Sequence, residues 1–182
     1  MNQYCNPLNI PVNVADANWN QYKKGRTNQV RCPSDIVGQD FIRWLASIGL
    51  QIFWLEIFHI APNASHVIHC DGHELDSKGK LNFIVGGANS KMVWYQAKSE
   101  DKIIKKISRA NTSFLTINQT DVIETYQKKI TGFNLVNVGK FHTVYNYSED
   151  RYCLSIAISD AVNNERLDFF KLQEKFKEYI CE

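Results

Sequence analysis

The chain has 182 residues and a formal net charge of +2, with 44% hydrophobic and 22% charged residues. This near-neutral balance provides no electrostatic drive toward nucleic acid or an anionic membrane, so we expect neither as a partner. A chain of this length suits one domain, 1–182, that buries a core of its own. No run approaches the ~18 apolar residues that a transmembrane helix needs.

Cysteine usage and the first residues of the chain bear on its compartment. The five cysteines are odd in number and include no Cys-x-x-Cys pair, which favours reduced thiols over a disulfide framework. Residues 1–14 lack the basic start and apolar stretch of a secretory signal. We therefore expect a protein of the cytoplasm.

The predicted elements run from a polar N-terminal segment to a C-terminal helix. Residues 1–33 are polar, contain three prolines and predict an irregular surface segment. Helical spacing of apolar residues predicts a helix over 34–48, with a stop at Gly49. From about 51 to 160, short β-type runs alternate with turns rich in Gly, Asn, Asp and Ser. An amphipathic pattern predicts a second helix over 163–180.

A helix, a series of short strands and a second helix predict a mainly β fold. The arrangement favours a double-stranded β-helix, a jelly-roll or cupin-like architecture with flanking helices. We expect both helices to cover the outside of one sheet, whose inner face forms a pocket. In the strand that follows residue 150, alternation predicts two faces. The helix-facing set is Tyr152, Leu154, Ile156 and Ile158, and the pocket-facing set is Arg151, Cys153, Ser155 and Ala157.

The tripeptide His69-Cys70-Asp71 carries the functional interpretation. Alternate residues of a strand share a face, so His69 and Asp71 project together while Cys70 faces away. His142 lies in a second β-type run, 139–146. Two histidines and a carboxylate leave one side of an octahedral ion open and are the usual ligands of non-haem Fe(II) oxygenases. The sequence thus predicts His69, Asp71 and His142 as metal ligands at a catalytic centre.

Arg151 follows His142 by nine residues and opens the next strand. A guanidinium holds a carboxylate through two parallel hydrogen bonds, better than an ammonium does. We expect Arg151 to anchor an acidic cosubstrate; the alternative is an ion pair with Glu149 or Asp150. Lys80, Asn82 and Ser155 are predicted to line the same pocket and contact the cosubstrate.

The remaining histidines and the aromatic strand residues are not predicted to bind the metal. His66 has the wrong parity relative to His69 and should point away from the metal. His59 ends an apolar strand and is predicted to be a satisfied core histidine, and His73 is a loop residue near the site. Trp94 and Tyr95 either line the pocket or pack in the core.

Together these motifs resemble the 2-oxoglutarate/Fe(II)-dependent dioxygenases. The resemblance is to the aspartyl/asparaginyl β-hydroxylase-like group, especially its small relatives from marine phages and bacteria. It spans about 51–160 and rests on residues 69–72, 81–85, 89–95 and 139–146 running into Arg151. It implies Fe(II), 2-oxoglutarate and O2, with the metal on His69, Asp71 and His142 and the far carboxylate of 2-oxoglutarate on Arg151. The implied reaction hydroxylates a peptide side chain or small molecule, in the host cytoplasm if a phage encodes the protein.

The chain departs from the family pattern at two places. Aspartyl hydroxylases proper often show Arg-x-His on the strand after the first ligand, where this chain has Lys80 and Asn82, and tend to lack the carboxylate ligand, here Asp71. Both departures weigh against an aspartyl-residue substrate and leave the oxygenase chemistry intact.

Two alternatives to a 2-oxoglutarate oxygenase stay open. One is a cupin-type metalloenzyme without 2-oxoglutarate, in which His73 or Glu74 would join the ligands. The other is a non-catalytic phage jelly roll with a structural or binding role. We further predict that residues 97–130 form a lid that selects the substrate.

Overall fold

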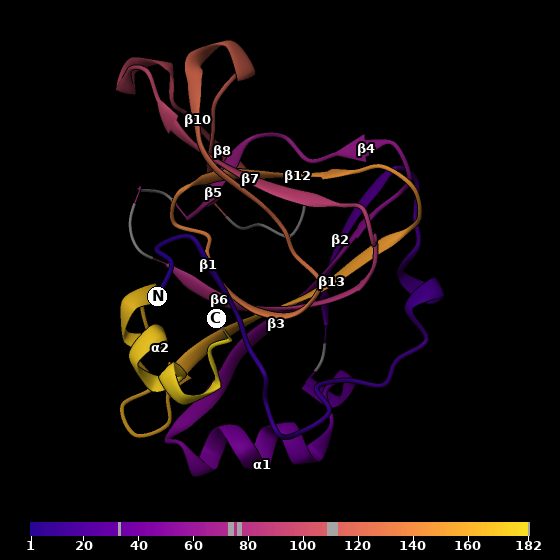
Figure 1. Cartoon of the computed structure of the whole chain (residues 1–182), viewed down its shortest axis with the longest axis vertical. Coiled ribbons are helices and arrows are strands. Elements are labelled where there is room, and N and C mark those ends of the chain that lie inside the picture. The colour runs from indigo at the N-terminus through magenta and orange to yellow at the C-terminus, as the bar shows by residue number, and fades with distance from the viewer. Residues whose placement is uncertain (33, 73–74, 76–77, 109–112, 182) are drawn as a thin grey trace.

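The computed structural model describes every residue except 33, 73–74, 76–77, 109–112 and 182 (Figure 1). Two antiparallel sheets face each other. The six-stranded sheet has the order β1 (Cys5–Pro7), β11 (Gly132–Asn137), β6 (Gly79–Gly86), β13 (Arg151–Asp160), β3 (Leu50–Ile60) and β2 (Thr27–Cys32). The seven-stranded sheet has the order β10 (Val122–Lys129), β7 (Lys91–Ala97), β12 (Phe141–Asn146), β5 (His69–Asp71), β9 (Ser113–Thr116) and β8 (Ile104–Ile107), with β4 (Ala64–Ser65) beside β12.

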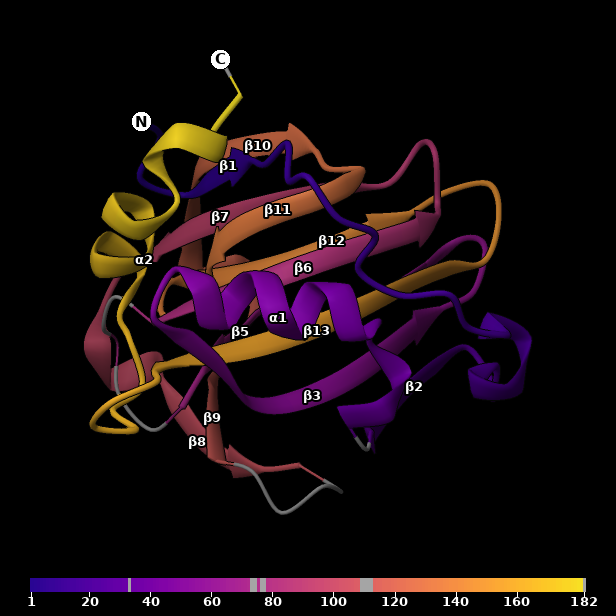
Figure 2. The ribbon, with the colours of Figure 1, turned by 90° about the horizontal axis from the view of Figure 1, so that it is seen from below.

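The mainly β prediction is confirmed: the sheets form a jelly-roll, cupin-like sandwich with two short helices. Figure 2 shows α1 (Gln39–Ser47) lying across the outside of the six-stranded sheet and α2 (Phe169–Lys175) at its side. Short 3-10 turns connect several elements: η1 (Trp19–Tyr22), η2 (Ser34–Ile36), η3 (Glu100–Lys102), η4 (Gln119–Asp121) and η5 (Lys177–Tyr179).

Strand β13 shows the two faces that its alternation predicts. Leu154, Ile156 and Ile158 are fully buried in the apolar core beneath the helices, together with Phe41 of α1 and Leu172 of α2. Burying a side chain of this size stabilises the fold by roughly 1.5–3 kcal/mol. The opposite face points between the sheets, where a second apolar cluster fills part of the interior; that cluster includes Ile60, Met92, Trp94, Val136 and Val144.

The N-terminal prediction is wrong, because the first 33 residues contribute two strands. β1 pairs with β11, and β2 pairs with β3, so both are edges of the six-stranded sheet. An edge strand is paired on one side and half-exposed, so a polar run such as Thr27–Cys32 satisfies it without apolar alternation.

Both helix boundaries also differ from the prediction. The α-helix begins only at Gln39, because Gly38 takes an extended conformation and its N–H donates to Val14. Residues 34–36 form η2 instead. At the other end of the chain, Arg166 bridges to Ser159 and Asp168 caps α2 by accepting a hydrogen bond from the Lys171 N–H, 2.8 Å away. The second helix therefore begins at Phe169 rather than near residue 163.

No disulfide joins any of the five cysteines. No helix among the described residues is long and apolar enough to cross a membrane.

Candidate metal centre

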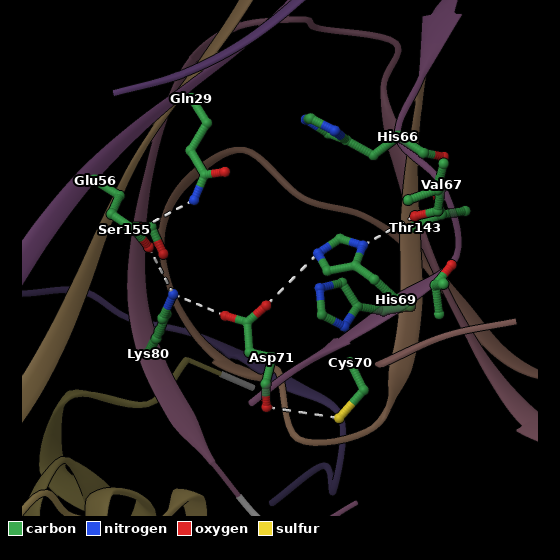
Figure 3. Close-up of polar contacts among 12 residues, drawn as sticks. Gln29, Glu56, His66, Val67, His69, Cys70, Asp71, Lys80, Thr143 and Ser155 are labelled. Atoms are coloured by element: carbon green, nitrogen blue, oxygen red, sulfur yellow. Dashed lines mark hydrogen bonds and ion pairs between the residues drawn. The ribbon is translucent and has the colours of Figure 1, made fainter. Parts of the chain in front are cut away.

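Three predicted ligands converge between the two sheets. His142 of β12 stands directly opposite His69 of β5 in the strand register, and their ring centroids are 4.4 Å apart. Asp71 follows on the same face of β5 (Figure 3). One ligand atom from each of the three side chains lies within 4.8 Å of the others, a spacing that suits a single metal ion. Cys70 faces away, as predicted, and its Sγ donates to the Gly139 carbonyl at 3.2 Å.

Backbone carbonyls fix the orientation of both imidazoles. His69 Nδ1 lies 2.9 Å from the Val67 carbonyl oxygen, and His142 Nδ1 lies 2.8 Å from the Lys140 carbonyl oxygen. A ring nitrogen beside a carbonyl must carry the proton and donate it. Both Nε2 atoms are therefore left as lone-pair donors, which is the tautomer that a metal-binding histidine needs.

The electrostatics of the site favour the ligand forms of these groups. Burial alone would raise the pKa of Asp71, but the Lys80 ammonium, 2.7 Å from Oδ2, and the two histidines hold that pKa well below its usual range. Burial, with His69 nearby, lowers the pKa of His142 to about 3, so its imidazole is neutral at physiological pH. A carboxylate and a neutral imidazole are the states that bind metal.

Arg151 is a fully buried cation, with 2% of its surface exposed. Its Nε donates to the Ser90 hydroxyl at 3.2 Å, and Gly87 lies against its stem, where an added Cβ would come within 2.7 Å of Cβ and Cγ. The alternative ion pair is not formed: Asp150 binds Lys23 and His59, and Glu149 accepts from the Ala88 N–H. Within the described part of the chain, no carboxylate pairs with Arg151.

The ligand set lies where two chambers meet. An inner chamber of about 50 Å³ is lined by Asn82, His142, Arg151, Cys153 and Ser155, among others. An outer chamber of about 510 Å³ is lined by Gln29, Trp54, Glu56, Lys80, Phe114 and Arg166, among others. Four residues line both chambers: Phe58, His66, His69 and Asp71.

The structure divides the predicted cosubstrate contacts. Asn82 and Ser155 face the inner chamber with Arg151, and the Ser155 hydroxyl donates to Asn82 Oδ1 at 2.8 Å. Lys80 lies in the outer chamber instead, between Asp71 and Glu56. Trp94 and Tyr95 pack in apolar clusters and line neither chamber.

The prediction for His66 is wrong. Its side chain lines both chambers, and its ring centroid lies 6.2 Å from that of His69. Residues 66–68 are not part of a strand, so side-chain alternation does not apply across them. Burial lowers the pKa of His66 to about 3, and its buried Nε2 has no hydrogen-bond partner among the residues that the structure describes.

The other histidine predictions have separate outcomes. His59 is a buried core histidine, as predicted, but it is only half satisfied: Nε2 lies 2.8 Å from Asp150 Oδ1, whereas the buried Nδ1 has no hydrogen-bond partner among the described residues. His73 and Glu74 lie outside the described residues. Ser113 and Phe114, within the predicted lid 97–130, line the outer chamber, and the selection of substrate by this segment stays a prediction.

Two residues beside the site were missed. Glu56 of β3 and Gln29 of β2 line the outer chamber and hydrogen-bond to each other at 2.9 Å. Glu56 had a signal: it is the only acid in the apolar run 51–60, where an ionised side chain needs a partner. Gln29 had none, because it lies in a polar segment.

Comparison with known proteins gives distant structural likenesses. No protein-family model matches the chain, and no curated protein matches it. Vicilin from Corylus avellana (hazelnut) aligns with TM-score 0.41 and 10% identity, over 81% of this chain and 32% of that one. Oxalate oxidase in complex with glycolate gives 0.36 and 10%, over 79% and 55%. E. coli ycfD gives 0.36 and 13%, over 69% and 30%.

This chain therefore spans about a third to about half the length of those proteins. Likenesses at this distance bear on neither activity nor ligand.

Proposed function

We propose that the protein is a non-haem Fe(II)- and 2-oxoglutarate-dependent dioxygenase that hydroxylates a peptide side chain or small molecule. One observation carries the proposal: Arg151, a buried cation with no carboxylate partner in the described chain, shares a small chamber with the His69, Asp71 and His142 set. An unpaired buried charge is costly, so an anionic ligand is expected to complete it.

The donor set fits Fe(II). His69 and His142 would bind through Nε2 and Asp71 through a carboxylate oxygen, and three protein ligands leave open positions on the ion. Bound Fe(II) supplies the chemistry that couples oxidation of the keto acid by O2 to hydroxylation of a substrate C–H bond.

The residues of the chain itself would bind the cosubstrate, orient it and exclude water from it. The Arg151 guanidinium would hold the far carboxylate of 2-oxoglutarate through paired N–H groups, with Asn82 and Ser155 beside it. Four aliphatic or thioether side chains form part of the remaining lining of the inner chamber: Ile60, Met92, Val138 and Val144. Walls that exclude water lower the local dielectric constant and strengthen the attraction between the guanidinium and the carboxylate. The larger outer chamber, which shares His69 and Asp71 with the inner one, would hold the substrate.

A second candidate is a metalloenzyme that needs no 2-oxoglutarate. One observation favours it: His66 lines both chambers beside the ligand set, and its Nε2 has no hydrogen-bond partner within the described chain. In that case Arg151 would serve another anion, and loss of Arg151 would not change any dependence on a keto acid.

The test is an anaerobic titration of the metal-free protein with Fe(II) and 2-oxoglutarate, followed by the weak visible charge-transfer band of a chelated keto acid. We expect a band that requires both additions and is absent in His69→Ala and Arg151→Met. Arg43→Met, which removes an arginine exposed on α1, is the matched control and should keep the band. Iron binding without a band would favour the second candidate, and no iron binding would favour a non-catalytic jelly roll.

A further inference from the structure

A series of polar contacts crosses the wall of the outer chamber and ends on a metal ligand (Figure 3). Gln29 Nε2 donates to Glu56 Oε1 at 2.9 Å. Lys80 Nζ then lies between two carboxylates, 3.1 Å from Glu56 Oε2 and 2.7 Å from Asp71 Oδ2. We call Gln29, Glu56, Lys80 and Asp71 the outer-wall network.

The outer-wall network joins the two sheets. Gln29, Glu56 and Lys80 belong to β2, β3 and β6 of the six-stranded sheet, whereas Asp71 belongs to β5 of the seven-stranded sheet. All three metal-ligand candidates are on the seven-stranded sheet. The Lys80–Asp71 ion pair therefore ties the ligand set to the opposite wall of the chamber.

Charge and burial make this contact well defined. Lys80 is 3% exposed and Glu56 is 4% exposed, so neither charge is well hydrated. One ammonium shared by two carboxylates leaves a net charge of −1 on the three groups, so negative charge remains available to a cation. Glu56, fixed by Gln29, holds Lys80 from the far side and limits how far the ammonium can follow Asp71.

Resting on the metal site of the proposed function, we propose that Lys80 is a positioning residue that leaves Asp71 a single oxygen for the metal. Oδ2 of Asp71 is occupied by Lys80, while Oδ1 faces the histidines, 3.6 Å from His69 Nε2. A carboxylate held in this way binds through one oxygen. If the carboxylate were free to rotate, it would present both oxygens and occupy a position that the reaction needs open.

The competing interpretation is that Lys80 only neutralises the buried Glu56. Single removal of Lys80 would then cost stability by leaving a buried carboxylate unpaired, without a specific effect on the metal. The double variant Lys80→Met/Glu56→Gln separates the two roles. It removes both buried charges, and Gln29 can still hydrogen-bond the new amide, while Asp71 has lost its partner.

The experiment uses Co(II) alone as the probe, because its visible spectrum reports the number and geometry of its ligands. Wild type, Lys80→Met, the double variant and Lys177→Met are titrated and also checked for thermal unfolding. Lys177→Met is the matched control: it makes the same change in an exposed Lys–Glu pair, where Nζ lies 2.7 Å from Glu174.

We expect the double variant to melt above Lys80→Met, because Glu56 no longer leaves a buried charge unpaired, and still to bind Co(II) about 10–100-fold more weakly than wild type and with shifted visible bands. Lys177→Met should match wild type in both. A double variant with the wild-type spectrum overturns the positioning role, even if Lys80→Met alone fails to fold.

Because the Co(II) titration contains no 2-oxoglutarate, it tests the role of Lys80 separately from the proposed cosubstrate. An unchanged Co(II) spectrum would overturn the role of Lys80 and leave the keto-acid titration untouched. Shifted Co(II) bands together with no keto-acid band would overturn the proposed cosubstrate and support the role of Lys80. A wild-type chain that binds no Co(II) would overturn both.

Discussion

The two sheets contribute different halves of the site. The seven-stranded sheet carries His69, Asp71 and His142, and the six-stranded sheet carries Arg151 and the residues around it. The strands also differ in length: β5 has three residues, whereas β13 has ten and β3 has eleven. The candidate metal ligands thus depend partly on a short strand, and Arg151 begins a long strand that is paired on both sides. Substitutions of these ligands in the seven-stranded sheet should therefore affect metal binding, and substitutions of Arg151 and its neighbours in the six-stranded sheet should affect 2-oxoglutarate binding.

The largest effect is expected from the ligands themselves. Ala in place of His69 or Asp71 should weaken Mn(II) binding by more than the about 100-fold that loss of an outer partner costs. His59→Gln, a change on the six-stranded sheet in a histidine bound to Asp150, is the control and should keep the metal. Calorimetric titration measures this, and equal losses in all three variants would contradict a division between the sheets.

Arg151→Met should spare the metal and remove the anion. We expect 2-oxoglutarate affinity to fall by about 2–5 kcal/mol, the cost of losing one member of a buried charge pair. Without ligand, the same variant should melt at a higher temperature than wild type, because it removes a buried cation that has no carboxylate partner among the described residues. Lower thermal stability of the ligand-free variant would show that groups of the protein already compensate the positive charge of Arg151.

Acid should destabilise the metal-free protein through His142. Its pKa is about 3 in the folded state against an ordinary value of 6.5, so the unfolded chain binds the proton first. The stabilisation is fully present above about pH 6.5 and is lost as the pH falls toward 3, at up to about 1.4 kcal/mol per pH unit. Denaturant unfolding across this range should show a shallower slope for His142→Gln, and an unchanged slope would exclude the burial effect.

Gly87→Ala tests how closely the backbone holds Arg151. A Cβ there would meet the arginine stem at 2.7–2.9 Å, and the residue has φ +63°. Gly132→Ala is a matched control with the same φ and nothing within 4 Å, so it carries the backbone strain alone. We expect 2-oxoglutarate affinity about tenfold lower for Gly87→Ala than for Gly132→Ala, with equal metal affinity. Equal keto-acid affinity would mean that the arginine does not need this position.

The smallest effect is expected from Ser155→Ala. The change removes the hydroxyl that donates to Asn82 Oδ1 and leaves that acceptor without its partner. The cost should be about 1 kcal/mol in 2-oxoglutarate affinity, with no change in metal affinity. Fluorescence or calorimetric titration resolves a change of this size, and an altered metal affinity would show that the two sheets are coupled here.

The parts of the site predictable from the sequence are those that depend on strand alternation. His69 and Asp71 share a face because β5 is regular, and Arg151, Cys153 and Ser155 share a face for the same reason. That rule uses only neighbouring residues. It failed at His66, where the chain between β4 and β5 is not a strand.

The remaining features depend on distant pairings. Glu56, the ion-pair partner of Lys80, lies 24 residues away on another strand, so this pairing could not be predicted from the sequence, and the predicted contact of Lys80 with the cosubstrate stays a prediction. The edge strand β2 was not predicted, because an edge position tolerates a polar sequence without apolar alternation. The starts of the two helices were predicted too early for a local reason. The N-caps Gly38 and Asp168 lie inside longer stretches whose apolar residues already follow helical spacing.

The brevity of β5 has a consequence for local opening. It pairs with β12 at one position, His69 with His142, and with β9 at three. A metal held by His69, Asp71 and His142 would act as a cross-link between β5 and β12, since it binds only when the two strands are closed together. At a concentration 100 times its Kd, such a metal would add about 2.7 kcal/mol to the free energy of opening. Hydrogen exchange at the Asp71 amide, which donates to Val138, would then slow by about two orders of magnitude, so metal binding would determine how often this three-residue strand opens.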